Sequence, residues 1–329
     1  MLGHDKIIPW EFSGNLAVQV FFALSGWLIG TILLNLNSTD LPRFFYNRIV
    51  RIWVPYYFAF FLLLLVACLK DQINPKWLEI VGYQATFVYN LFGTQQLLKY
   101  KSIMPLEGTG NGLWSVNAEE QFYLIAPLML VLLPKFGQKI ISWVLISITL
   151  YFTIDYSSIS FGVLAALLNK RYPDFHSTKV ATLLLLILLL LCIYGFTHAD
   201  QDLYNKIKPF FAISCVLLLA RKGARNPISA FLGGVSYPLY LNHWIGVFLA
   251  NFLFGHSHDS LLRNIVSSTS NILICSIFYV LIDKKMLSIR DRLYTVKRGK
   301  IALFTGYLVV TIGVIFGLII KYLFPIELS

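Results

Sequence analysis

The chain has 329 residues, of which 57% are hydrophobic and 13% are charged, and its formal net charge is +11. Soluble domains carry about a quarter of their residues as charged side chains, so this composition, with a mean hydropathy of +0.69, excludes a soluble fold. The positive charge does not indicate nucleic acid binding, because a membrane protein collects Lys and Arg in its cytoplasmic loops.

Apolar runs of roughly helix-spanning length follow one another along the whole chain. They lie near 14–35, 51–69, 113–133, 139–154, 157–168, 180–196, 208–220, 231–255, 263–283 and 301–324. These runs predict an all-α fold, a polytopic bundle of about ten transmembrane helices, and one integral-membrane domain over residues 1–329.

The segment 78–92 is apolar but contains Gly82, Gln84 and Asn90, so it reads as a crossing, a re-entrant loop or an interfacial helix. If it returns to the side it left, the loops that become cytoplasmic carry two thirds of the 27 Lys and Arg residues. The positive-inside rule therefore favours a return. The amino terminus then lies outside, either because the stretch before Gly14 is translocated or because a further helix precedes it.

Small and basic residues mark the first two runs. Gly26 and Gly30, next to Ser25, form a small-xxx-small pair that lets two helix backbones approach closely. Arg48 and Arg51 follow three residues apart, on one helical face at the cytoplasmic edge. Arg suits phosphate groups, so this pair is read either as a topology anchor or as a site for an anionic cofactor.

Two adjacent carboxylates lie inside the 113–133 run. A charged side chain in lipid costs at least about 2.5 kcal/mol, so Glu119 and Glu120 form a functional-site hypothesis. Ser115 and Glu119 share a helical face, while Glu120 lies about 100° away. One carboxylate can then face a polar cavity while the other meets the rim or a basic partner. The alternative is that both cap the start of the helix.

Polar residues also interrupt the 231–255 run, where Ser236, Tyr240 and His243 form a stripe at helical spacing. His243 can exchange a proton near neutral pH or serve as an interhelical hydrogen bonder. The basic run 284–300 that follows the ninth span reads as a topology anchor or as a contact for anionic headgroups or acyl-CoA phosphates. On its own, His4 is a surface histidine.

The four cysteines have no spacing typical of metal sites or of a disulfide framework. Each lies in a different apolar run, and we expect all of them to be small buried hydrophobic residues. They are Cys68, Cys192, Cys215 and Cys275.

Four motifs together resemble the acyltransferase 3 family of bacterial integral-membrane acyltransferases. In order they are FFALSGWLIG (21–30), FYNRIVRIWVPYY (45–57), LWSVNAEEQFYLIAP (113–127) and SYPLYLNHW (236–244). The resemblance extends over nearly the whole chain. It implies transfer of an acyl group, most often acetyl from acetyl-CoA, to a hydroxyl of a carbohydrate or cell-envelope glycan, in the bacterial inner membrane and without a bound metal. The partners implied are the lipid bilayer, acyl-CoA and the carbohydrate acceptor, and the oligomeric state is left open.

The resemblance also implies roles for single residues. Glu119 would be catalytic, and Arg48 and Arg51 would bind the acyl-CoA. The residues expected to line the site are Ser25, Gly26, Trp114, Ser115, Glu120, Tyr240 and His243.

The chain departs from the family pattern at its start. Family members begin with a helix that bears an Arg and, about one helix-length later, a His taken as the catalytic base. The context of His4 resembles the end of that helix, so His4 is the expected base, and the first helix is expected to be missing. Gln19 and Ala17 replace the usual Asp and Gly.

The mechanism expected from these residues is general-base catalysis. His4 would take the proton of the acceptor hydroxyl, and Glu119 would orient the imidazole or stabilise its charged form. Arg48 and Arg51 would lie at the opposite face of the membrane from His4. The thioester would then have to reach inward through the bundle on its pantetheine arm, or an acyl-enzyme step would carry the acyl group between the two faces. A carrier of sugars or lipid-linked precursors is the rival interpretation, since ten helices with intramembrane Glu and His would also suit a transporter.

Overall fold

The computed structural model describes residues 13–221, 223, 226–255 and 261–323. All regular elements in these ranges are helical, so the expected all-α class is confirmed. The described residues fall into two compact units. Unit 1 contains 40–121, 226–255 and 261–323, and unit 2 contains 13–39, 122–221 and 223.

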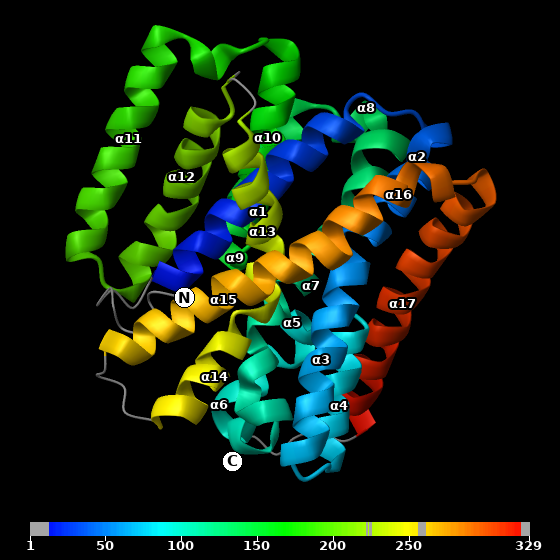
Figure 1. The fold of residues 1–329 in the computed structure, drawn as a ribbon. Coiled ribbons are helices and arrows are strands. Elements are labelled where there is room, and N and C mark those ends of the chain that lie inside the picture. Colours follow the sequence, from blue (N-terminus) through cyan, green and yellow to red (C-terminus); the bar gives the residue numbers. More distant parts are fainter. Residues whose placement is uncertain (1–12, 222, 224–225, 256–260, 324–329) are drawn as a thin grey trace. The chain divides into compact units, whose positions relative to one another are not determined.

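Unit 2 is a bundle of apolar helices in which α1 packs against α10 and α12, while α11 and α12 run side by side (Figure 1). Thr178 and Asp200 begin α11 and α12 as N-caps, since their side chains accept hydrogen bonds from backbone N–H groups of the first turn. The helices are α1 (Ser13–Leu33), the end of α7 (Trp114–Pro127), the π-helix Leu128–Leu132, α8 (Pro134–Gly137), α9 (Ile140–Thr153), α10 (Ser157–Arg171), the 3-10 turn Phe175–Ser177, α11 (Lys179–His198) and α12 (Gln201–Leu219).

Glycines bring α1 and α10 into backbone contact. A Cβ on Gly26 would lie 2.0 Å from the carbonyl oxygen of Ile159, and a Cβ on Gly162 would lie 2.2 Å from the carbonyl oxygen of Ala23. A Cβ on Gly30 would meet the Cβ of Ala166 at 3.1 Å. The close approach predicted from the small residues of the first run is confirmed.

A buried ion pair joins α12 to the loop before α10, and the sequence analysis did not single it out. The Nζ of Lys208 lies 2.7 Å from Asp155 Oδ2 and donates to Asn205 Oδ1 at 2.8 Å. The Lys208 side chain is 3% exposed, whereas the Asp155 side chain is 43% exposed. The ammonium therefore depends on these two oxygens, while the carboxylate also reaches the surface.

This asymmetry predicts unequal effects when either partner is removed. We expect Asp155→Asn to lower the free energy of unfolding by about 3 kcal/mol, because it leaves a buried ammonium without a counter-charge. Lys208→Met should cost less, since the remaining carboxylate is partly solvated. Thermal unfolding of the purified protein in detergent measures both. Asp202→Asn, which breaks the exposed pair with Lys206, is the control and should cost no more than about 0.5 kcal/mol. Equal losses in all three variants would refute the prediction.

Unit 1 contains the remaining helices, joined in its middle part by short 3-10 turns between Thr94 and Leu113. The helix α17 packs against α2, and α14 lies beside α15 (Figure 1). The helices are α2 (Leu41–Arg48), the π-helix Ile49–Trp53, α3 (Val54–Lys70), α4 (Pro75–Ala85), α5 (Tyr89–Phe92), α6 (Leu97–Tyr100), the start of α7, α13 (Pro227–Asn242), α14 (Trp244–Phe254), α15 (Leu261–Phe278), the π-helix Tyr279–Lys284, α16 (Lys285–Leu293) and α17 (Val296–Leu323).

Five helical stretches in the described part of the chain are long and apolar enough to cross a membrane. They are Gly14–Leu33, Ser38–Lys70, Lys179–His198, Leu261–Leu293 and Val296–Leu323. Ile140–Thr153 and Trp244–Phe254 are shorter apolar helices. These helices indicate an integral membrane protein, while the expected number of about ten spans is not confirmed.

Many apolar side chains of these helices point outward, as expected for surfaces that face lipid. Leu190 and Leu191 on α11 are 63% and 61% exposed. The same effect corrects the expectation for the cysteines. Cys192 and Cys275 are buried, but Cys68 is exposed and Cys215 is intermediate. An apolar run in a membrane protein does not identify its buried face, because both faces are apolar.

The 78–92 segment is divided into α4 and α5 by a tight turn. Phe87 adopts φ = 57°, and the N–H of Val88 donates to the carbonyl of Tyr83 at 2.9 Å, which is the hydrogen bond of a Schellman motif. The ring of Phe87 is fully buried against Trp53 and Tyr56. This packing holds a left-handed conformation that a bulky residue rarely adopts.

The 231–255 run, expected as one crossing, is two helices that meet at His243. At this break the N–H of Gly246 donates to Asn271 Oδ1 on α15 at 2.8 Å. In a continuous helix that N–H would bond to the carbonyl four residues earlier. The side chain of Asn271 therefore supports the break, and because it lies in a distant run, the local sequence gave no signal for it.

Candidate functional site

A buried network of polar side chains lies in unit 1 where α7 begins. Asn117, fully buried, donates from Nδ2 to the carbonyl of Leu113 at 2.9 Å and to the hydroxyl of Tyr56 at 3.1 Å. Its Oδ1 accepts from the N–H of Tyr89 at 3.0 Å. The Tyr56 hydroxyl donates to the carbonyl of Gln84 at 2.8 Å. One amide thus ties α7 to α3 and to the turn between α4 and α5.

Both carboxylates of α7 are buried beside this network. Glu119 is 3% exposed and Glu120 is 2% exposed, so the alternative that they cap an interfacial helix end is wrong. Tyr240 lies within electrostatic reach of Glu119. Arg48 and Trp53 are neighbours of Glu120. The two adjacent carboxylates therefore face different surroundings, and Glu120 meets a basic partner as the helical spacing allowed.

Glu120 also has hydrogen-bonding capacity left over. Its carboxylate lies close to the indole N–H of Trp53, but within the described residues neither its Oε2 nor Trp53 Nε1 makes a hydrogen bond of good geometry. Buried polar atoms are rarely left in this state. A carboxylate oxygen and an indole N–H held near each other can therefore receive a polar group or a water molecule.

Ser115 and Tyr240 join α7 to α13. Their hydroxyl oxygens are 2.5 Å apart, and Tyr240 also donates to the carbonyl of Gly112. Because a phenol has only one proton, Ser115 donates to Tyr240. The structure therefore brings together three of the residues expected to line a site, since Glu119 lies on the same side of α7.

The predicted stripe on α13 is not a continuous polar surface. Ser236 is exposed and donates to the carbonyl of Gly233, one turn back in its own helix. The Nδ1 of His243 donates to the carbonyl of Tyr240 at 3.0 Å. In a neutral His243 this bond places the proton on Nδ1. Nε2 is then free of a proton and can accept a hydrogen bond.

Arg48 and Arg51 do not have the same surroundings. The π-helix Ile49–Trp53 begins directly after Arg48 and widens the turn that separates the two side chains. Arg48 is partly buried near Glu120, whereas Arg51 is exposed and lies within electrostatic reach of Asp283. The surface that could receive an anionic group is therefore centred on Arg51, with Arg48 behind it.

The other residues expected in the site are placed as follows. His4 lies outside the described residues. Ser25 is buried in unit 2 next to Gly26, whose missing side chain is explained by the contact between α1 and α10. Trp114 is partly buried at the first position of α7. Within the described ranges, no group of three or more His, Cys, Asp and Glu side chains could hold a metal ion.

Sequence reasoning missed Tyr56, Asn117 and Trp53, which complete the network around the carboxylates. All three lie inside motifs that were noticed for other reasons. Asn117 gave a signal, since an amide inside an apolar run must find hydrogen-bond partners within the protein. Together these residues provide a buried carboxylate beside several hydroxyl groups, which is an arrangement suited to proton transfer.

Comparison with known proteins gives the following matches. The family model described as an acyltransferase domain matches residues 2–282. O-acetyltransferase OatA of Staphylococcus aureus is 27% identical over 282 residues, which cover 71% of this chain and 46% of that protein. YrhL of Bacillus subtilis, a proposed peptidoglycan O-acetyltransferase, is 25% identical over 288 residues, covering 71% and 44%. The chain spans less than half the length of these curated relatives, and no solved structure matches it significantly.

Proposed function

Because the chain belongs to the acyltransferase 3 family, we propose that it moves an acyl group, most often acetyl, from acyl-CoA to a hydroxyl of a carbohydrate or cell-envelope glycan. The relatives named as O-acetyltransferases support the reaction class. The proposed location is the bacterial inner membrane, crossed by about ten helices, with residues 1–329 acting as one acyltransferase domain.

The observation that carries this proposal is the burial of Glu119 beside Tyr240, Ser115 and the Asn117 network. Burying a carboxylate in a membrane bundle costs free energy, so a position that keeps one is a candidate functional site. In the proposed reaction, the acceptor hydroxyl oxygen attacks the thioester carbonyl and the carbon–sulfur bond breaks. The base takes the hydroxyl proton, and the CoA thiolate leaves and is reprotonated.

We assign the base to His4 and propose that Glu119 positions its imidazole and stabilises the imidazolium form. Ser115 and Tyr240 would align the acceptor hydroxyl. Four further residues are proposed to line the site, namely Trp114, His243, Ser25 and Gly26. For the transferred acyl group and for the acceptor, we propose only the chemical class.

The proposal is tested by supplying labelled acetyl-CoA to membranes that contain the chain and to matched membranes that lack it. We expect chain-dependent label in carbohydrate material, released as acetate by mild alkali, as an oxygen ester requires. Label that stays in acetyl-CoA while folded protein is present would contradict the proposal. Chain-dependent movement of a sugar across the membrane without ester formation would support the carrier.

Arg51 gives a separate prediction for the acyl-CoA. Hydrogen bonds to charged groups contribute roughly 1.5–3 kcal/mol, so Arg51→Ala should raise KM for acyl-CoA at least about tenfold while kcat changes little. Arg43→Ala is the control, because Arg43 is an equally exposed arginine of α2 that pairs with Asp291. Steady-state kinetics at varied concentrations of acyl-CoA measure KM and kcat for both variants. Equal KM values in both variants would exclude Arg51 from the donor site.

A further inference from the structure

A groove in unit 2 combines a basic rim with an apolar wall. It has a volume of about 640 Å³ and lies between α9 and α10. Its apolar wall includes Ile140, Ile141 and Val144 on α9 and Leu167 on α10. Ile141 is 60% exposed, so the wall is open to the surroundings of the bundle.

Three cations lie together at one end of this groove. Lys139 immediately precedes α9, while Lys170 and Arg171 occupy the last turn of α10. Lys170 donates to the carbonyl of Leu34 at 2.7 Å and to Gln138 Oε1 at 3.2 Å, and both acceptors are neutral. Among the residues that the structure describes, no acidic side chain lines the groove. Its rim is therefore strongly positive, and nothing in its lining balances that charge.

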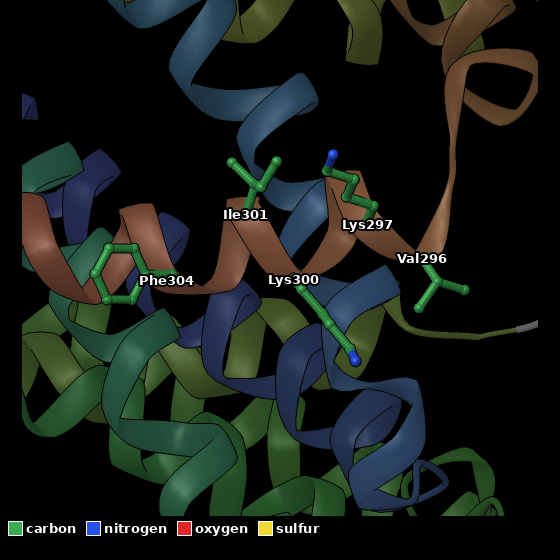
Figure 2. Close-up of a pocket in the computed structure, with 5 residues that line it drawn as sticks. All are labelled: Val296, Lys297, Lys300, Ile301 and Phe304. Carbon is green, nitrogen blue, oxygen red and sulfur yellow. The ribbon is translucent and has the colours of Figure 1, made fainter.

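Unit 1 has a second groove, with a volume of about 510 Å³, at the start of α17, and it too is lined by cations and apolar side chains. Figure 2 shows the Lys297 and Lys300 side chains extending in different directions from the start of α17, with Ile301 and Phe304 further along the helix. Cations in the first turn of a helix oppose its dipole. Lys297 lies in that first turn, so the helix gains nothing from its charge.

We propose that both grooves bind anionic phospholipids of the cytoplasmic leaflet, with the phosphate on the basic rim and an acyl chain along the apolar wall. Basic pockets at the ends of membrane helices suit such headgroups. The loops 134–139, 169–179 and 284–300 that supply the cations are those placed on the cytoplasmic side by the distribution of Lys and Arg. A free phosphate would leave the apolar walls unused, and a zwitterionic lipid would leave the positive charge unbalanced.

The experiment measures binding of phosphatidylglycerol and phosphatidylcholine to the purified full chain by native mass spectrometry. One variant combines Lys139→Ala with Arg171→Ala, and a second combines Lys297→Ala with Lys300→Ala. The control combines Lys99→Ala with Lys101→Ala, which removes two exposed cations, one on α6 and one directly after it. Circular dichroism verifies that each variant is folded. Ile141→Ser tests the apolar wall without changing the charge.

At about fivefold per cation, each groove variant should lose at least about tenfold in phosphatidylglycerol affinity at one site. The control should change less than about twofold, and phosphatidylcholine binding should stay the same. Ile141→Ser should weaken phosphatidylglycerol binding while leaving soluble glycerol phosphate unaffected. Equal binding of the two lipids by the unmodified chain, or equal losses in groove and control variants, would overturn the proposal. Full competition by soluble glycerol phosphate would also overturn it.

Discussion

Gly162→Ala is expected to be among the most destabilising substitutions in the chain, and Gly162→Leu is expected to prevent folding. A Cβ at this position would lie 2.2 Å from the carbonyl oxygen of Ala23 and 2.6 Å from the backbone nitrogen of Trp27. Both atoms belong to the backbone of α1, which cannot give way as a side chain can. We expect a loss of about 3 kcal/mol for the alanine variant.

Thermal unfolding in detergent measures this effect, with Gly233→Ala as the matched control. A Cβ on Gly233 meets no atom of the described residues within 4 Å, and the residue lies inside α13, where alanine is favoured over glycine by up to about 1 kcal/mol. The control should therefore be as stable as the unmodified chain or slightly more stable. Similar stability of Gly162→Ala and Gly233→Ala would show that α1 and α10 are not in backbone contact.

Glu119→Gln should strongly slow acyl transfer while the protein stays folded. The amide has nearly the same shape as the carboxylate but cannot accept a proton or stabilise an imidazolium ion. General acid–base groups typically contribute 10²–10⁴-fold to the rate, and we expect a loss of about this size in kcat. The measurement is the initial rate of acetyl ester formation from labelled acetyl-CoA at saturating donor.

Glu107→Gln is the control for this variant, because Glu107 is an exposed carboxylate of the same unit. It should keep full activity, and the thermal unfolding midpoint of Glu119→Gln should stay close to that of the unmodified chain. If Glu119→Gln unfolds, Glu119→Asp serves as the second variant, since it keeps the charge and should recover part of the activity. Undiminished transfer by folded Glu119→Gln would remove Glu119 from the mechanism.

The helical class and the positions of the apolar runs could be predicted from the sequence, because they depend on composition and spacing along one helix. The close approach of α1 and α10 was also foreseeable from Gly26 and Gly30. The sequence did not identify α10 as the helix that α1 approaches, because Gly162 lies far along the chain. The exposed Cys68 shows a related limit, since hydrophobicity in a membrane protein does not identify the face that is buried.

The carboxylate pair of the candidate site was predictable from its cost in lipid, and its burial is confirmed. The surroundings of the pair depend on tertiary contacts that no local pattern contains. Asn117 organises three segments, and Arg48 is a neighbour of Glu120 although the two residues lie far apart in the sequence. In the same way, the break at His243 depends on Asn271, which belongs to another helix. The catalytic role of Glu119 stays a prediction.

The most direct test of the central claim compares kcat and KM for acyl-CoA in Glu119→Gln and Glu120→Gln. We propose that Glu119 takes part in the chemistry and that Glu120 positions its neighbour Arg48. This assignment predicts a fall in kcat of about 10² or more for Glu119→Gln with little change in KM, and a changed KM with kcat largely kept for Glu120→Gln. Loss of kcat in Glu120→Gln alone, with Glu119→Gln active, would contradict it.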